Sequence, residues 1–246
     1  MSTVLIIGAT SAIAHEASRR FAVEGARLLL VARNEAKLQA NADDLMARGA
    51  SSIDTFILDA NDFDRHAALM EAVHSTFPNG LDHALLAYGT LPDQTEVAAD
   101  ADAAVDAFTT NATSVIALLT HLAGLFEKQE RGAIAVISSV AGDRGRPSNY
   151  VYGAAKGAVS LFAQGLRARM AKHGVSVTTI KPGFVDTPMT ADIPKNRLFA
   201  DPADVGARIH KAMKKGQDVV YIPAFWRCVM GVIKAIPERV FKKLDL

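Results

Sequence analysis

The sequence has a single cysteine, Cys228, in 246 residues. One cysteine excludes an internal disulfide and fits a reducing compartment. The N-terminus enters a predicted strand at once, with no charged segment before an apolar one, so we expect no signal peptide. No run of about eighteen uncharged apolar residues occurs, and no transmembrane helix is predicted. From these absences we expect a cytoplasmic protein.

Excess charge of one sign and metal-binding patterns are lacking as well. Lysine and arginine number 27 and aspartate and glutamate 26, so a net charge of +1 gives no general attraction to nucleic acid. The 7 histidines have no partners at the spacing of metal ligands, and no metal site is predicted. No internal repeat, low-complexity tract or proline- and glycine-rich linker divides the chain. We therefore expect one domain over residues 1–246, large enough to bury a core.

Short apolar strands alternate with longer helical patterns along the chain. The predicted strands are 3–8, 27–32, 52–58, 82–87, 133–138, 175–180 and 218–221. The predicted helices are 11–24, 35–48, 62–77, 102–130 (as one helix or two), 150–172 and 201–215. This alternation is typical of a parallel sheet with helices on both faces. It predicts an α/β fold with a doubly wound parallel sheet of about seven strands, which binds ligands at the carboxyl ends where the strand order reverses.

The turn after the first predicted strand, residues 8–14 (GATSAIA), has features of a phosphate-binding loop. Gly8 permits a sharp turn, and the N-terminus of the next helix offers free N–H groups to a pyrophosphate. A strand–glycine–helix junction is also ordinary α/β structure, so the turn alone leaves both interpretations open. The candidate cofactor-binding residues here are Gly8, Thr10, Ser11, Ala12 and Ile13.

A serine, a tyrosine and a lysine suggest acid–base chemistry. Ser139 follows a predicted strand, and Tyr152 and Lys156 are spaced to share one helix face. A phenol with a pKa of about 10 is a poor acid–base catalyst at neutral pH, and a nearby lysine cation would lower that pKa. The Ser139 hydroxyl would hydrogen-bond a substrate oxygen. A lone Tyr–Lys pair is usually a surface feature, and it is the placement of several such features at strand ends that favours catalysis.

Residues 138–159 (SSVAGDRGRPSNYVYGAAKGAV) resemble the serine and Tyr-x-x-x-Lys segment of the short-chain dehydrogenase/reductase family. Ser139 precedes Tyr152 by 13 positions, the interval usual in that family. The resemblance covers residues 3–220 and implies a Rossmann-type fold and a nicotinamide cofactor. It implies that Asn111 holds a water in a proton relay, and that residues 181–189 (KPGFVDTPM) approach the nicotinamide. The further cofactor contacts that it implies are Tyr152, Lys156, Pro182, Gly183, Val185 and Thr187.

The end of the fourth predicted strand departs from the family. Its members commonly have Asn-Asn-Ala-Gly where this chain has LAYG at residues 86–89. The asparagine that braces the sheet is therefore missing, and we expect the Tyr88 ring near the adenosine or substrate cleft. Ala87, Tyr88 and Gly89 are predicted to line the adenosine side. With Ala12 in the phosphate turn, this indicates a reshaped cofactor cradle.

The loop after the second predicted strand favours NADP(H) over NAD(H). An NAD enzyme normally has an acidic residue there for the ribose diol, and this chain has Ala32 followed by Arg33. An arginine would attract the 2′-phosphate of NADP, although a solvated loop arginine is the alternative. Asp59 would accept from the adenine amine. We predict NADPH-dependent reduction of a ketone, with a regulator without turnover and an NAD-dependent alcohol dehydrogenase as alternatives.

Residues 224–246, the C-terminal tail, combine apolar residues at helical spacing with interleaved basic ones. Such a segment could lie on a membrane surface, or it could pack on its own domain or a partner subunit. The tail resembles the branch of the family that reduces decaprenylphosphoryl-2-keto-pentose, a lipid-linked keto-sugar. That resemblance implies a keto-sugar or lipid-linked ketone as the small-molecule substrate. The family also implies a homodimer or homotetramer that forms through the helices at 103–130 and 150–172.

Overall fold

A computed structural model describes residues 1–244 of the chain. Its 7 strands form one sheet in the order β3-β2-β1-β4-β5-β6-β7, and every neighbouring pair is parallel. The strands are β1 (Thr3–Ile7), β2 (Arg27–Ala32), β3 (Ser52–Ile57), β4 (His83–Leu86), β5 (Gly132–Ile137), β6 (Val175–Pro182) and β7 (Val219–Ile222). The order reverses between β1 and β4, so the predicted doubly wound parallel sheet is confirmed.

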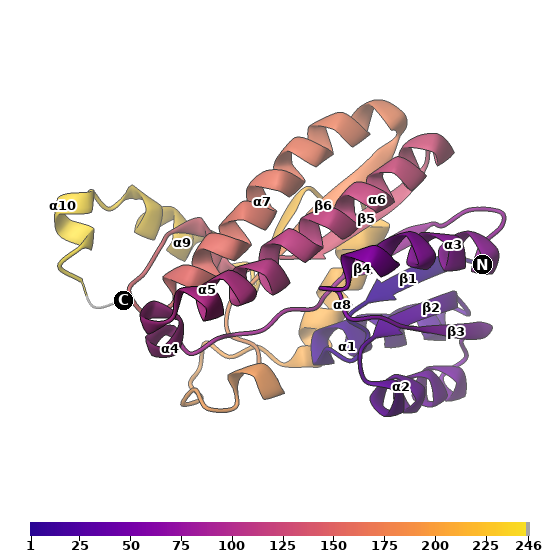
Figure 1. The fold of residues 1–246 in the computed structure, drawn as a ribbon, viewed down its shortest axis with the longest axis horizontal. Helices are drawn as coiled ribbons and strands as arrows, with labels where there is room; N and C mark the ends of the chain where they lie inside the picture. The colour runs from indigo at the N-terminus through magenta and orange to yellow at the C-terminus, as the bar shows by residue number, and fades with distance from the viewer. Residues whose placement is uncertain (245–246) are drawn as a thin grey trace.

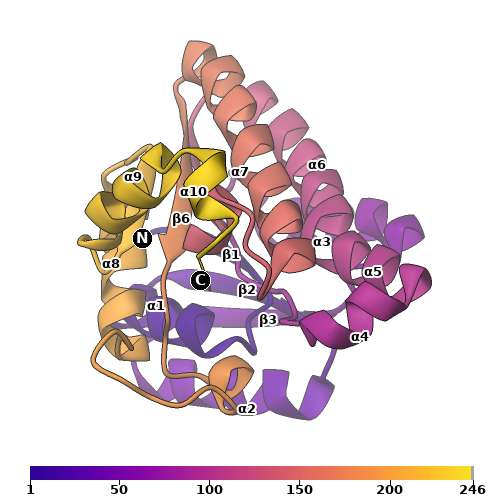
Figure 2. The same ribbon diagram turned by 90° about the vertical axis from the view of Figure 1, so that its left-hand side faces the viewer.

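Helices cover both faces of this sheet (Figure 1). They are α1 (Ala12–Val23), α2 (Glu35–Ala47), α3 (His66–Thr76), α4 (Gln94–Ala99), α5 (Ala101–Phe108), α6 (Ser114–Gln129), α7 (Tyr150–Met170), α8 (Pro202–Lys214), α9 (Trp226–Ala235) and α10 (Glu238–Phe241). Helices α1, α2 and α8 pack on one face, and α3, α6 and α7 pack on the other. Figure 2 shows the sheet between these two layers.

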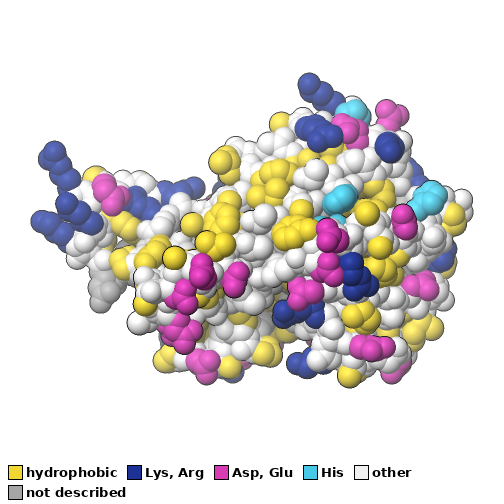
Figure 3. Space-filling model, in the orientation of Figure 1, with side chains coloured by type: hydrophobic (Ala, Val, Ile, Leu, Met, Phe, Trp, Pro, Cys, Tyr) yellow, Lys and Arg dark blue, Asp and Glu magenta, His cyan; other side chains and the backbone are white. Residues whose placement is uncertain are grey.

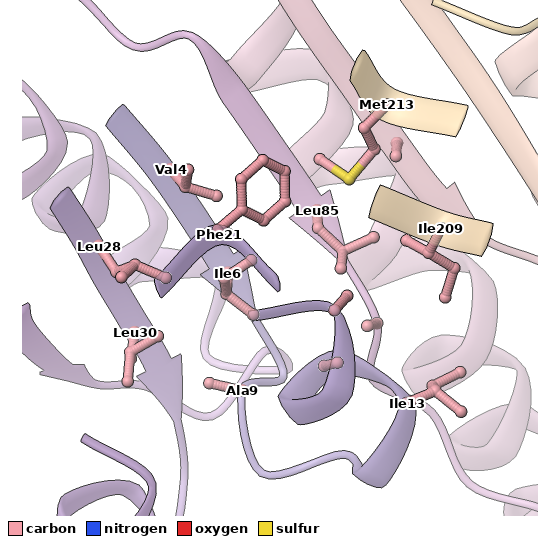
Figure 4. Close-up of a cluster of buried hydrophobic side chains, with 14 of the residues drawn as sticks. Val4, Ile6, Ala9, Ile13, Phe21, Leu28, Leu30, Leu85, Ile209 and Met213 are labelled. Carbon is pink, nitrogen blue, oxygen red and sulfur yellow. The ribbon is translucent and has the colours of Figure 1, made fainter. Parts of the chain in front are cut away.

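Alternating side chains of the central strand supply both cores. Val4 and Ile6 of β1 point into the cluster under α1 and α8, where they meet Phe21 (Figure 4). Leu5 and Ile7 point into the opposite cluster, because successive side chains of a strand face opposite sides. A strand buried on both faces reads as a continuous apolar run, which is why β1 was predictable.

The predicted helix over 102–130 is two helices, α5 and α6, joined by a π-helical turn at Thr109–Thr113. The stretch Ala101–Gln129 is the one among residues 1–244 that is long and apolar enough to cross a membrane. Here α6 acts as a core helix, because Leu118, Leu122 and Phe126 are fully buried against the sheet.

Several local features differ from the prediction. The helix expected at 62–77 begins with a 3₁₀ turn at Phe63–Arg65, and the α-helix proper starts at His66. The short helix α4 was not predicted at all. It starts because the Asp93 carboxylate caps it, accepting from the backbone N–H groups of Thr95 and Glu96.

The tail forms α9 and α10, which extend beyond the carboxyl end of β6 (Figure 1). Trp226 and Met230 of α9 are buried and pack against Val140. The apolar face of the tail is therefore used in part within its own chain.

Candidate active site

A cavity of about 710 Å³ opens at the carboxyl ends of the central strands. It lies where the strand order reverses, the position expected for a ligand in such a sheet. Every predicted site residue except Asn111 lines this cavity, although these residues lie far apart in the chain. These are Gly8, Thr10, Ser11, Ala12, Ile13, Arg33, Asp59, Ala87, Tyr88, Gly89, Ser139, Tyr152, Lys156, Pro182, Gly183, Val185 and Thr187.

The turn from β1 to α1 has the geometry that a pyrophosphate needs. Gly8 has a φ of 86°, and a Cβ there would lie 2.7 Å from the backbone nitrogen of Tyr88, so only glycine fits. Ser11 precedes α1 but its side chain makes no capping hydrogen bond. The positive N-terminus of α1 thus faces the cavity without a capping side chain, which fits an anionic ligand.

Asn41 of α2 supports this turn and was missed by the sequence analysis. Its Nδ2 donates to the carbonyl of Ala9 at 2.9 Å. The contact joins residues 32 positions apart, so no local pattern could indicate it.

Arg33 and Asp59 meet at the rim of the cavity below β2 and β3. The Nη1 of Arg33 lies 3.5 Å from an Asp59 carboxylate oxygen, and both side chains are largely exposed. The Asp59 carboxylate at this end of the cavity thus already lies next to the Arg33 guanidinium, and Ala32 supplies no second carboxylate. Because both side chains are exposed, the Arg33 guanidinium is accessible to a ligand phosphate.

Ser139 and Tyr152 face the same part of the cavity. The Ser139 hydroxyl accepts from the backbone N–H of Ala141 at 3.1 Å and lies 3.5 Å from the carbonyl oxygen of Pro182. Burial raises the pKa of the Tyr152 phenol to about 12, and the Ser139 hydroxyl opposes this shift in part. The phenol is therefore protonated at neutral pH.

Lys156 lies beneath Tyr152 and is buried. Its Nζ donates to the carbonyl of Ile137 at 3.2 Å and lies 5.7 Å from the centroid of the Tyr152 ring. Burial lowers the pKa of Lys156 to about 8. Among the protein's own groups, burial of the phenol dominates the pKa of Tyr152. The expectation that the Lys156 cation lowers this pKa stays a prediction.

Asn111 is fully buried in the π-helical turn and does not line the cavity. Its Oδ1 accepts from the Thr90 N–H at 3.0 Å, and its Nδ2 donates to the Ala107 carbonyl at 2.9 Å. A Cβ on Gly89 would lie 2.7 Å from Asn111 Oδ1 and 3.3 Å from Lys156 Nζ. Asn111 thus stands directly behind Gly89, beside Lys156. Its role in a water relay stays a prediction.

Tyr88 lines the cavity and also braces it. The phenol shares a hydrogen bond of 3.0 Å with the Ser114 hydroxyl, which itself donates to the Thr110 carbonyl. Burial raises the pKa of Tyr88, so the phenol stays protonated. This tyrosine ties the end of β4 to α6.

The far end of the cavity is bounded by the tail and by the loop before α7. Trp226 of α9 packs so closely on Gly183 that a Cβ there would lie 2.0 Å from the indole nitrogen. Arg146 and Asn149 also line this end, and neither was predicted. An arginine and an asparagine in a polar loop follow no sequence pattern that predicts a site. They line the cavity only because the fold brings this loop against it.

Comparison with known proteins agrees with this geometry. Residues 2–198 match the family model described as short chain dehydrogenase. The chain belongs to the short-chain dehydrogenase family. It is similar to an uncharacterized oxidoreductase of Mycobacterium tuberculosis (strain ATCC 25618 / H37Rv), at 37% identity over 98% of this chain and 96% of the relative. An uncharacterized oxidoreductase of Streptomyces coelicolor is 33% identical over 98% of this chain and 95% of the relative.

A solved structure supports the fold of this short-chain dehydrogenase. Levodione reductase superimposes with a TM-score of 0.83 at 22% identity, covering 92% of this chain and 98% of that one. Family membership makes the chain an NAD(P)-dependent oxidoreductase, as predicted. Short-chain dehydrogenases act on small molecules and commonly oligomerise.

Proposed function

We propose that this short-chain dehydrogenase reduces a ketone to a secondary alcohol with NADPH. The observation that carries the proposal is the convergence of Ser139, Tyr152 and Lys156 on one wall of the cavity, with the phenol protonated. A protonated phenol is the form required to donate a proton to a ketone oxygen.

Each residue has a distinct task in the reduction. The hydride for the carbonyl carbon comes from the bound nicotinamide. Tyr152 gives its phenolic proton to the carbonyl oxygen, and the Ser139 hydroxyl hydrogen-bonds that oxygen as negative charge develops on it. The Lys156 cation stabilises the tyrosinate left behind, and Asn111 connects the lysine to solvent through a water.

The preference for NADPH rests on the rim of the cavity. Arg33 is exposed beside Asp59, and no carboxylate stands at Ala32 to bind a ribose diol. Titrating the protein with NADPH and NADH while following nicotinamide fluorescence tests this preference. We expect tighter binding of NADPH and a selective loss of that advantage in Arg33→Ala. Equal binding of both cofactors would contradict the NADP assignment, and binding of neither would favour a protein without turnover.

Replacing Tyr152 with phenylalanine tests the reaction itself. The variant keeps the ring and removes the proton donor, so kcat for ketone reduction should fall by about 10²-fold or more. The affinity for NADPH should change little, since the ring stays in place. A variant that turns over as fast as the parent would exclude Tyr152 as the acid.

The tail supports a further proposal, contact with a lipid surface and a keto-sugar or lipid-linked substrate. Val232 of α9 is 68% exposed and Val240 of α10 is 50% exposed. Basic side chains gather at the same end of the molecule (Figure 3). Removing residues 224–246 should abolish sedimentation with vesicles that contain anionic phospholipid. Retained sedimentation would exclude the tail as the contact.

The outer faces of α5 and α7 support a homodimer or homotetramer. Val105, Phe108 and Leu161 are large apolar residues with 62%, 37% and 71% exposure, on the helices that the family uses for association. Figure 3 shows apolar side chains over this region. Leu161→Glu should shift the mass measured by light scattering toward the monomer, and an unchanged mass would place the interface elsewhere.

A further inference from the structure

Arg146 is a cation inside the cavity without an acidic partner. It lies in the loop between Ser139 and Tyr152 and lines the cavity with them. Its Nε is buried and has no hydrogen-bond partner within residues 1–244. Burial lowers the pKa of Arg146, and no acid of the described chain opposes the shift. An arginine keeps its charge nonetheless, so this partly buried guanidinium, with no acidic partner and an unsatisfied Nε, favours the binding of an anion.

Two neighbouring amides also have unused polar atoms. The Oδ1 of Asn149 is buried without a partner and does not cap α7, which starts at the next residue. The Nε2 of Gln94 is likewise unpartnered, while its Oε1 accepts from the Val151 N–H at 3.2 Å. Buried polar groups normally find partners. Gln94 does not line the cavity, but Asn149 does, beside Arg146, so its unsatisfied oxygen indicates a hydrogen-bond donor of a ligand at this place.

The charged residues that line the cavity differ between its two ends. Arg33 and Lys37 line the end near β2, together with the carboxylate of Asp59. The other end, near Arg146, has no carboxylate among the described lining residues. Apolar residues that line the cavity include Leu91, Met189, Ile193 and Trp226.

We propose that the substrate is an anionic ketone whose carboxylate or phosphate binds Arg146. The rest of the substrate lies along the apolar residues of the cavity, and its carbonyl lies between Ser139 and Tyr152. The inference rests on the proposed ketone reduction. Guanidinium groups bind both kinds of anion through paired N–H donors. The α1 N-terminus and Arg33 are the partners proposed for the cofactor phosphates, and Arg146 is then the cation that remains for the substrate.

Matched pairs of ketones test this with a readout that does not need turnover. The probes are 2-oxooctanoate against its methyl ester, and dihydroxyacetone phosphate against dihydroxyacetone. Binding to the protein–NADP⁺ complex, which has no hydride to transfer, is followed by the fluorescence of Trp226, the sole tryptophan, which lines the cavity. We expect at least one anion to bind about tenfold or more tightly than its neutral partner. Arg146→Ala should weaken that anion by about 10- to 100-fold and leave the neutral partner unchanged.

Two variants serve as controls. Arg146→Lys keeps the charge without the paired donors and should recover only part of the affinity. Arg208→Ala removes an exposed arginine of α8 that does not line the cavity and should change nothing. The Kd for NADPH should stay constant in all three variants, which shows that Arg146 does not serve the cofactor.

The outcomes separate the inference from the function on which it rests. Absence of NADPH binding to the parent protein would overturn the proposed function and this inference together. NADPH-dependent reduction of a neutral ketone, without preference for either anion, would overturn only the inference. The inference would also be overturned if Arg146→Ala weakened the binding of the anionic and the neutral ketone of a pair equally, or if neither anion bound. Preference for one pair identifies the anion as carboxylate or phosphate.

Discussion

In the proposed mechanism, the protonation of Lys156 controls how readily Tyr152 gives up its proton. Burial lowers the pKa of the lysine to about 8, so the side chain is a cation below that pH and neutral above it. The pKa of Tyr152, about 12, lies too high to contribute in this range. In that mechanism, only the lysine cation stabilises the tyrosinate that forms during reduction.

We therefore expect kcat/KM for ketone reduction to be flat below about pH 8 and to fall above it. The pH profile should be measured with NADPH and any ketone that the protein reduces. In Lys156→Arg the decline should vanish from the accessible range, because arginine stays charged. A parent profile without a break near pH 8 would show that this lysine does not titrate in the reaction.

Tyr88 and Ser114 allow a prediction about stability at the same scale. Tyr88→Phe removes the phenol but leaves Ser114 bonded to the Thr110 carbonyl. Ser114→Ala instead leaves a buried phenol without its partner. An unsatisfied buried polar group costs about 1–3 kcal/mol, more than the net loss of a typical hydrogen bond. Ser114→Ala should therefore lower the free energy of unfolding in urea more than Tyr88→Phe, and the opposite order would refute this account.

Among the elements, the end of the tail is held to the body by the hydrogen bonds and ion pair of one residue, Arg144. The Nη1 of Arg144 donates to the carbonyls of Ile233, Lys234 and Ile236 at 3.2, 3.0 and 2.7 Å. These carbonyls lie at the end of α9, where helix carbonyls lack internal partners. The guanidinium also pairs with Glu238 at 2.8 Å and lies 3.9 Å from the Phe241 ring centroid.

Arg144→Ala should free α10 from the body of the protein. We expect limited trypsin digestion to cut the tail much faster in this variant, since local opening exposes its lysines and arginines. Arg239→Ala, which removes an exposed arginine of α10, is the matched control. It should not speed trypsin cleavage at the remaining lysines and arginines of the tail. Equal rates in the parent and Arg144→Ala would mean that the apolar contacts of Trp226 and Met230 suffice.

This fastening also shows where prediction from the sequence ends. The strands were predictable because their apolar runs are local, and β2 (Arg27–Ala32) was predicted with its observed bounds. Ser139, Tyr152 and Lys156 were predictable because their spacing is local too. The contacts of Arg144 cross about 90 residues, as those of Asn41 cross 32, and no pattern within one segment encodes such pairs. Arg146 was missed for the same reason.

At the scale of the whole molecule, the sheet joins both cores. The clusters on the two faces share β1, β2 and β4, so one cannot lose its packing without exposing the other. The small cluster of Val140, Trp226 and Met230 connects the tail to this body at the cavity. Residues of the body and the tail therefore line one common site, and the cavity depends on both.

We expect residues 1–246 to unfold as one domain in a single cooperative transition, the tail included. Circular dichroism follows the helices of the body, whereas the fluorescence of Trp226 reports only on the junction with the tail. If the protein is one unit, both signals change at the same urea concentration and with the same m-value. A fluorescence transition at lower urea would mean that the tail detaches first. Such detachment would open the Arg146 end of the cavity while the sheet remains folded, and would make the tail a separately mobile cover of the substrate site.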